Sequence, residues 1–300
     1  MRYGYNPAQF TRSALTPEKH KDRTVSPTIC VDIAVLNDPK LFDTLNSLRG
    51  QSLKPDLVLI ADGGSPAGFI EKIRNEFYDL PLEVVVLPGS HITTKDASID
   101  HITTDIAAFL DSDEVAPQEW LATITKPIID GVADFTGGPT RPPGEPKNNI
   151  ERYYNELERR IYEGDVEQDV VYMPLGNTAW RTSLLKKLRF DHRIVFRGGA
   201  PDYDLEMRAV DAGYRGLFVR DAWAYHNKGT VKGYGSLMKH RYRYLVGAAV
   251  VMIKNRRLGK RAGEKRTRIR MPFAYVEDLM KPIALVHAFI YWEFVVKRKE

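Results

Sequence analysis

The chain has 300 residues, of which 43% are hydrophobic and 28% charged, a balance typical of a folded protein with a sizeable core. Its single cysteine, Cys30, excludes an internal disulfide and a cysteine-rich metal site. The net charge is +5, yet residues 254–270 alone hold nine Lys or Arg and one Glu. The body of the chain is therefore close to neutral, and its one cationic segment needs a separate explanation.

The first half of the chain alternates between two kinds of pattern. Residues 1–27 are polar and contain three prolines, so we expect an irregular arm without a secretory signal. From residue 28 on, apolar runs typical of buried strands alternate with helical spacing. We expect strands at 28–36, 56–62, 82–87 and 106–111, and helices at 39–53, 66–77 and 94–108. The alternation predicts an α/β fold on a mostly parallel sheet.

The second half is less regular. Residues 137–149 are rich in Pro and Gly and predict a surface loop. We expect helices at 150–164 and 205–213, and a strand at 218–226 that ends at His226. Beyond residue 230, two apolar runs, 244–253 and 282–296, flank the cationic segment. Both are shorter than the roughly 20 residues that span a bilayer, which favours helices that are buried or lie in a membrane interface.

Acidic side chains end two of the predicted strands. Asp62 ends the second strand, and Asp111 and Asp113 end the fourth. Because ligands of open α/β sheets bind at the carboxyl ends of the strands, we expect these carboxylates to converge. Oxygen ligands on a short Asp-x-Asp turn suit Mg²⁺ or Mn²⁺. Because such an ion also binds phosphate oxygens, we predict a diphosphate ligand. A solvated acidic turn or a helix cap is the alternative.

Four ordered segments then resemble the family-2 glycosyltransferases, which have the GT-A fold. They are AVLND followed by LFDTLNSLRGQSLKPDLVLIADGGS, TKDASIDHITTDIAAFLDSDE, GNTAWRTSLLKKLRFD, and GGAPDYDLEMRAVDAGYRG. The resemblance covers residues 28–229. It implies an inverting, metal-dependent hexosyltransferase that uses a nucleotide sugar, and it leaves UDP, GDP and dTDP donors open.

The resemblance also implies roles for the matched positions. Asp202 matches the general base, which would remove a proton from the acceptor hydroxyl as it attacks the sugar C1. Asp113 would bind Mg²⁺ or Mn²⁺, with His226 as a further metal contact, and the metal would stabilise the leaving nucleoside diphosphate. The other matched positions would contact the donor: Ala34, Val35, Asn37, Asp62, Lys95, Asp111 and Ser112.

Three departures from the family pattern matter. Gly63 stands in place of an Asp. Lys95 and Asp96 stand where Arg and Asn are common, so the cation lacks a bidentate fork. Pro201 replaces the acid that usually precedes the base, which leaves Asp204 as a competitor for that role. A helix cap or a first-turn charge is the simpler interpretation of Asp204.

The cationic segment predicts an anionic partner. Flanked by apolar helices, it would hold a cytoplasmic, peripheral protein at an anionic membrane surface, the inner face of the cell membrane, with a lipid-linked or saccharide acceptor. The segment contains no aromatic residue for base stacking, which argues against nucleic acid. A solvated loop between core helices is the alternative, and a homodimer through the C-terminal helices stays open.

Two other functions compete with sugar transfer. A sugar-phosphate nucleotidyltransferase would carry an early glycine-rich phosphate loop, where this chain has AVLNDP. A non-catalytic protein could bind nucleic acid or membrane through the basic segment, and metal-dependent donor hydrolysis would exclude it. We therefore expect three parts: an arm over 1–27, a GT-A catalytic domain over 28–230, and a basic helical extension over 231–300.

Overall fold

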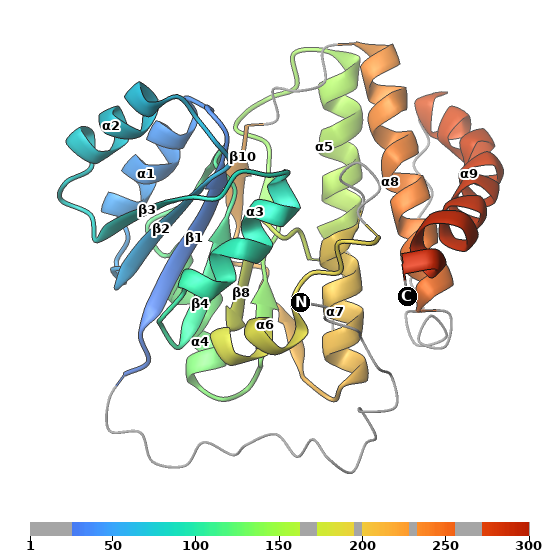
Figure 1. The fold of residues 1–300 in the computed structure, drawn as a ribbon. Coiled ribbons are helices and arrows are strands. Elements are labelled where there is room, and N and C mark those ends of the chain that lie inside the picture. The colour runs from blue at the N-terminus through green and yellow to red at the C-terminus, as the bar shows by residue number, and fades with distance from the viewer. Residues whose placement is uncertain (1–25, 163–172, 195–199, 228–232, 256–271, 300) are drawn as a thin grey trace.

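The computed structural model describes residues 26–162, 173–194, 200–227, 233–255 and 272–299. These residues form a seven-stranded sheet in the order β3-β2-β1-β4-β8-β6-β9 and a three-stranded sheet in the order β5-β10-β7 (Figure 1). The large sheet consists of β1 (Ile29–Val35), β2 (Leu57–Asp62), β3 (Leu82–Val86), β4 (Ile106–Leu110), β6 (Phe135–Gly137), β8 (Asn177–Arg181) and β9 (Gly216–Phe218). The small sheet consists of β5 (Glu114–Val115), β7 (Thr140–Arg141) and β10 (Ala224–His226).

Strands β3, β2, β1 and β4 run parallel, whereas β8 runs antiparallel to both β4 and β6. The predicted mostly parallel α/β sheet is therefore confirmed, and so are the four strands expected in its first half. The strand β8 was not predicted. Strand β1 is buried along its whole length, because helices cover both faces of a parallel sheet.

Two helical layers cover the large sheet. One hydrophobic cluster joins β1 residues such as Val31 and Ile33 to α1 (Leu41–Arg49), α2 (Ala67–Glu76) and α4 (Trp120–Ile129). A second cluster joins Cys30 to α3 (His91–Ser98), α6 (Thr182–Leu188) and α7 (Pro201–Asp211) on the opposite face. The alternation of side chains along β1 thus feeds both layers. Cys30 is a free, buried packing residue, as expected.

The helix predicted at 94–108 is wrong in its bounds. The helix α3 begins at His91, where the Ser90 hydroxyl accepts a hydrogen bond from the Thr93 backbone nitrogen, and it ends at Ser98. A single 3₁₀ turn, Ile99–His101, follows. The strand predicted at 106–111, whose first three residues overlapped the predicted helix, is the fully buried β4 in the centre of the sheet.

The Pro- and Gly-rich loop is also wrong at its start, because Thr140–Arg141 form β7 and pair with β10. Gly138 permits this close approach, since a Cβ there would lie 1.8 Å from the carbonyl oxygen of Ala222. The strand predicted at 218–226 is two short strands, β9 and β10, and His226 ends the second. The helix α5 (Asn149–Tyr162) was predicted, whereas α4 was not.

Two long helices, α8 (Tyr234–Lys254) and α9 (Pro272–Tyr291), complete the described chain, and α9 continues as one π-helical turn, Trp292–Val296. Their apolar side chains pack together and against Met207 of α7. Among the described residues, one helical stretch, Tyr275–Val296, is long and apolar enough to cross a membrane. It is longer than the apolar run seen in the sequence. The arm over 1–25 and residues 256–271 of the cationic region lie outside the described residues.

Candidate active site

A short turn after β4 carries the acidic residues Asp111, Asp113 and Glu114. The Glu114 backbone nitrogen donates a hydrogen bond to the carbonyl oxygen of Asp111 (3.0 Å), which closes the turn. The chain then enters β5, which pairs antiparallel with β10 so that Glu114 lies opposite His226. Two segments far apart in the sequence thereby place three carboxyl groups and one imidazole at the carboxyl end of the central sheet.

His226 lies among these carboxyl groups. Its Nε2 is 3.2 Å from Asp113 Oδ1, and its Nδ1 is 3.4 Å from Glu114 Oε1. Asp113 also faces Lys40 Nζ at 3.6 Å. The carbonyl of the intervening Ser112 accepts a hydrogen bond from a threonine hydroxyl of α1 (3.0 Å), which fixes the turn on that helix. The structure thus brings the predicted pair Asp113 and His226 together.

Asp111 is held from the other side by α3. Lys95 Nζ is 2.7 Å from Asp111 Oδ1, and His91 Nε2, one helical turn earlier, is 3.6 Å from the same oxygen. The Lys95 side chain is fully buried, so it has no exposed surface with which to contact a donor. Behind the carboxylate, Gly176 leaves room for Asp111 Oδ2, which a Cβ at that position would approach to 2.4 Å. Sequence reasoning missed His91, which no motif distinguishes.

The surroundings move the pKa values of these acids apart. Burial raises the pKa of Asp111, but Lys95, His91 and His226 outweigh burial and hold it well below its usual range. Burial also raises the pKa of Asp113, and contact with His226 more than offsets it. For Glu114, burial has the largest effect. Burial and the neighbouring carboxylates together raise its pKa to about 8, although His226 acts in the opposite direction. A protonated carboxyl therefore lies beside ionised ones at neutral pH.

The cluster fits a divalent cation. One ligand atom from each of Asp111, Glu114 and His226 lies within 4.8 Å of the other two. Among the described residues, Glu114 Oε1 is buried without a hydrogen-bond partner, a costly state that a bound cation would relieve. Carboxylate oxygens suit Mg²⁺ and Mn²⁺. Glu114 was not predicted as a ligand; its position directly after the Asp-x-Asp turn was the only signal in the sequence.

A second group of predicted residues lies at the neighbouring ends of β1 and β2, where Val35 pairs with Asp62. Asp62 is buried and accepts hydrogen bonds from the backbone nitrogen (3.0 Å) and the hydroxyl of Ser65. The same hydroxyl accepts a hydrogen bond from the Asn37 backbone at 2.7 Å. Asn37 adopts a left-handed φ of 48°, and Ala34 is buried. These contacts fix the two loops, and direct contact with a donor base or ribose stays a prediction.

The helix α7 carries the predicted base. It begins at Pro201, earlier than the sequence predicted, which places Asp202 in its first turn. One turn later, Glu206 is buried, and its pKa is raised by burial and by the charge of Asp202. Glu206 accepts a hydrogen bond from the Met173 backbone nitrogen (3.3 Å), in the segment that leads through Gly176 into β8. The helix of the predicted base is therefore fixed to the segment that backs the acidic cluster.

Asp204, the competing candidate, has no exposed surface. Its carboxylate accepts hydrogen bonds from Arg208 Nε (2.8 Å) and Lys254 Nζ (2.7 Å). Asn255 Nδ2 donates a further one (2.9 Å). A carboxylate with no exposed surface and three hydrogen-bonded partners cannot reach the hydroxyl of an acceptor, which favours the structural interpretation of Asp204 and leaves Asp202 as the candidate base.

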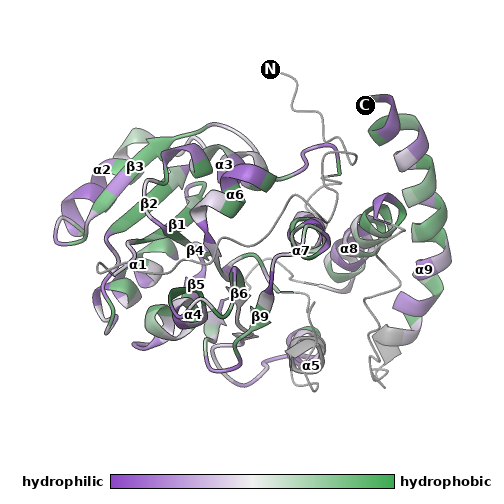
Figure 2. Cartoon of the chain, turned by 90° about the horizontal axis from the view of Figure 1, so that it is seen from below, coloured by the Kyte–Doolittle hydropathy of each residue, from purple (hydrophilic) through white to green (hydrophobic). Residues whose placement is uncertain are grey.

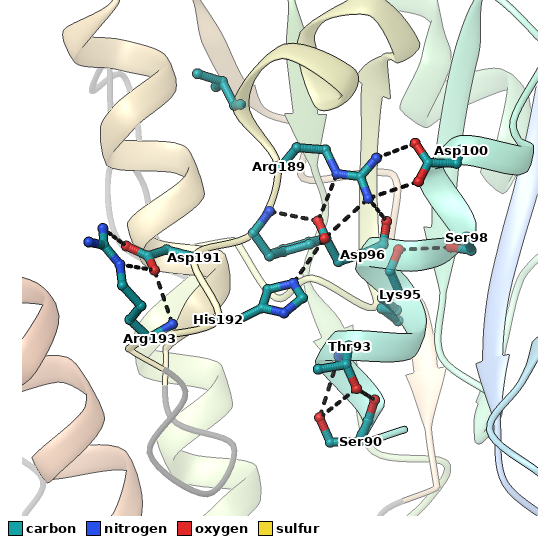
Figure 3. A network of polar contacts seen from close by, with 12 residues as sticks. Ser90, Thr93, Lys95, Asp96, Ser98, Asp100, Arg189, Asp191, His192 and Arg193 are labelled. Atoms are coloured by element: carbon teal, nitrogen blue, oxygen red, sulfur yellow. Dashed lines mark hydrogen bonds and ion pairs between the residues drawn. The ribbon is translucent and has the colours of Figure 1, made fainter. Parts of the chain in front are cut away.

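Asp96, which stands where Asn is common in the family, is the centre of a polar network on α3 (Figure 3). It accepts hydrogen bonds from Arg189 (3.1 and 3.2 Å), and its Oδ2 lies 2.9 Å from His192 Nε2. Arg189 also binds Asp100, and it adopts a strained left-handed φ of 51°. The carboxylate at position 96 is thus explained by its two partners, Arg189 and His192, which lie in the segment that follows α6.

Known proteins share both sequence and fold with this chain. Residues 31–189 match the family model described as Glycosyl transferase family 2. The mannosyltransferase PcManGT from Pyrobaculum calidifontis, solved in complex with GDP-Man and Mn²⁺, is 20% identical with a TM-score of 0.61, over 90% of this chain and 75% of that chain. A search of curated proteins found no match.

Two further solved structures show the same fold. S. aureus TarS 1–349 in complex with UDP-GlcNAc is 16% identical with a TM-score of 0.52, over 89% of this chain and 73% of that chain. Glucosyl-3-phosphoglycerate synthase from Mycobacterium tuberculosis, in complex with Mn²⁺, UDP-glucose and phosphoglyceric acid, is 17% identical with a TM-score of 0.52, over 78% and 80% of the two chains. Because the family model covers more than half of the sequence and the fold is GT-A, the chain belongs to glycosyl transferase family 2.

Proposed function

We propose that the protein transfers a hexosyl group from a metal-bound nucleoside-diphosphate sugar to an acceptor, with inversion at the anomeric carbon. The observation that supports this most is the convergence of Asp111, Asp113, Glu114 and His226 at the carboxyl end of the sheet, in a chain of this family. Solved neighbours carry GDP-Man, UDP-GlcNAc or UDP-glucose, which supports a donor of the same class without choosing its base.

We assign the metal to Asp111, Asp113, Glu114 and His226, with Mg²⁺ or Mn²⁺ as the ion. When bound, such an ion stabilises the negative charge of the leaving nucleoside diphosphate. The protein adds a hydrogen-bonding group beside Asp111: the His91 side chain is 53% exposed and accessible to a phosphate oxygen. Ionised Asp111 and Asp113 are ready to bind a cation at neutral pH, whereas Glu114 would release its proton when it becomes a ligand.

Asp202 is the proposed general base. It lies in the first turn of α7. The carboxylate would take the proton of the acceptor hydroxyl while that oxygen attacks the sugar C1 and the bond from C1 to the diphosphate oxygen breaks. A single displacement of this kind inverts the anomeric configuration.

The acceptor would approach from the side of α7. We propose a hydroxyl or phosphate of a lipid-linked or saccharide acceptor, because α8 packs directly on α7 and the apolar helix α9 packs on α8. This arrangement puts the helical extension next to the helix that carries Asp202.

The experiment begins with the donor. Thermal shifts with UDP-, GDP- and dTDP-sugars, with and without Mn²⁺, identify the nucleotide that stabilises the folded chain. Transfer to water is then followed by nucleoside diphosphate release, and the anomer of the freed sugar is identified by NMR.

We expect Asp202→Asn to lower turnover about 10²- to 10⁴-fold with donor binding unchanged. Asp211→Asn, at the exposed end of the same helix, is the matched control. Full turnover by Asp202→Asn, or an equal loss in the control, would contradict the assignment of the base.

A further inference from the structure

The helix α9 presents a broad apolar surface to solvent. On the side turned away from α8, large apolar side chains recur at helical spacing. Six of them, between 50% and 75% exposed, are called here the outer face of α9: Leu279, Ile283, Val286, Phe289, Ile290 and Phe294. In Figure 2, α9 lies at the edge of the molecule beyond α8 and is coloured mostly hydrophobic. A patch of this kind marks a surface that meets a partner.

Two polar side chains of α9, Glu277 and His287, contact the neighbouring helices instead. Glu277 accepts two hydrogen bonds from Arg241 of α8 (2.8 and 3.1 Å) and one from the Tyr153 hydroxyl of α5. Ten residues on, His287 Nδ1 lies 3.0 Å from the Tyr242 hydroxyl. The inner side of α9 is therefore fixed to the protein at two levels, which leaves the outer face free to meet a partner without unfolding the helix pair.

These anchors also decide how α9 could meet a bilayer. Glu277 lies within Tyr275–Val296, the stretch that is long enough to cross a membrane. Crossing would either break the ion pair with Arg241 or carry it into the hydrocarbon, at a cost of several kcal/mol. If α9 lies lengthwise in the interface, its outer face is buried in lipid while Glu277 and His287 keep their protein partners.

The charge of the region selects the kind of surface. Residues 231–300 contain seventeen Lys or Arg and five Asp or Glu, whereas the chain before them carries an excess of acid. On α9 itself, the acids Asp278 and Glu293 are each paired with a lysine, at 2.6 and 3.1 Å. The extension therefore offers positive charge without unpaired negative charge on α9, which complements an anionic surface.

We propose that α9 docks lengthwise, through its outer face, in the interface of an anionic phospholipid bilayer. A second copy of the chain would supply the same apolar helix but also the same positive charge, so the charges of two copies would repel. An anionic bilayer satisfies both the apolar face and the charge of the extension. This docking goes beyond sugar transfer, because it requires neither donor nor metal.

The test is sedimentation of the full chain with vesicles of phosphatidylcholine alone and of phosphatidylcholine with phosphatidylglycerol at about 3:1, without donor or metal. We expect binding to the anionic vesicles, weakened when NaCl rises from about 0.1 M to about 1 M and the Debye length falls from about 10 to about 3 Å. Ile283→Gln with Val286→Gln should lower partitioning about tenfold or more, because both side chains lose their burial in lipid. The control, Ile129→Gln with Val132→Gln, changes two exposed aliphatic residues near the end of α4 and should bind like the parent chain.

A second measurement reports on the outer face directly. An Ile283→Cys variant can be labelled with an environment-sensitive fluorophore, since Cys30 is fully buried. Its emission should shift to the blue with anionic vesicles. Docking is refuted by equal vesicle binding of the Ile283/Val286 variant and the parent chain, by an unchanged emission, or by a dimer in solution that the double variant dissociates. Binding that alkaline carbonate cannot reverse would refute the lengthwise arrangement and indicate crossing.

Discussion

Two groups of buried carboxyl residues lie in different parts of the molecule, and their charges are balanced in different ways. At the end of the sheet, Asp111, Asp113 and Glu114 surround His226, and Glu114 Oε1 has no hydrogen-bond partner among the described residues. We call this group the sheet-end cluster. Its three carboxyl groups share two lysines, Lys95 and Lys40, so the cluster has capacity for a further positive charge once Glu114 is ionised.

Beside α7, Asp204 and Asp191 share the ammonium group of Lys254, at 2.7 and 2.8 Å. Arg208 and Arg193 add one ion pair each. Burial raises the pKa of both acids, but these cations outweigh it and hold both pKa values below their usual range. We call this group the α7 cluster. A cluster whose acids all have cationic partners joins structural elements, in this case α7, α8 and the segment that follows α6. A cluster with a carboxyl group that lacks such a partner is prepared to bind a cation.

The largest effect on folding is expected from Lys254→Met. Lys254 is 7% exposed, and its loss leaves Asp204 and Asp191 short of their shared cation. Removing one partner of a buried ion pair costs about 3–5 kcal/mol, and urea unfolding would measure that loss. Lys297→Met removes a lysine that is 55% exposed and paired with Glu293, and should cost less than about 1 kcal/mol. Equal effects of the two substitutions would mean that the α7 cluster does not hold the extension to α7.

A second prediction concerns Asp32, a buried carboxyl that belongs to neither cluster. Its Oδ2 accepts a hydrogen bond from the Ser98 hydroxyl, and its Oδ1 has no partner among the described residues. Burial raises its pKa from 3.8 to about 6 despite Ser98 and the charge of Lys95. Because the folded state holds this proton more tightly than the unfolded chain, Asp32 is least costly below about pH 4 and lowers stability as the pH rises to about 6.

Asp32→Asn removes this titration and keeps an acceptor for Ser98. Above about pH 6 the variant should be more stable than the parent chain by up to roughly 3 kcal/mol, and the gain should vanish near pH 3. Chemical unfolding over this pH range measures the difference. Asp43→Asn, which removes an exposed carboxyl from α1, is the control. A gain that does not depend on pH would show that ionisation of Asp32 is not its cause.

The sequence predicted the parallel half of the sheet because each of its strands is a continuous apolar run with a helix between it and the next. It could not predict the pairing of β5 with β10, since strands of two and three residues carry no periodicity. Glu114 was missed for that reason: its burial depends on this pairing. Lys254 was counted with the cationic segment, although it is buried between two acids, because charge along the chain does not reveal which lysine meets a carboxylate. The pairing of Asp113 with His226 came from family resemblance.

The smallest expected effect separates the two clusters most directly. Mn²⁺ at about 100 times its dissociation constant should stabilise the folded chain by about 2.7 kcal/mol, if the sheet-end cluster binds it. Glu114→Gln keeps the shape of the side chain but removes a charged ligand, so it should weaken Mn²⁺ binding. Loss of the free Mn²⁺ signal in electron paramagnetic resonance gives the affinity, and thermal shifts give the stabilisation.

Asp191→Asn is the matched variant of the α7 cluster. It should lower stability without Mn²⁺ and leave Mn²⁺ affinity unchanged, because Asp191 already has Lys254 and Arg193 as partners. Glu114→Gln should do the reverse and raise stability without Mn²⁺ as the pH rises past about 4.5, with the full gain above about pH 8, where the folded parent chain must carry the buried Glu114 charge. Asp191→Asn should thus change metal-free stability alone and lower it, whereas Glu114→Gln should lower the affinity for Mn²⁺ and raise metal-free stability. If both changed Mn²⁺ affinity alike, charge balance would not distinguish a binding cluster from a structural one in this fold.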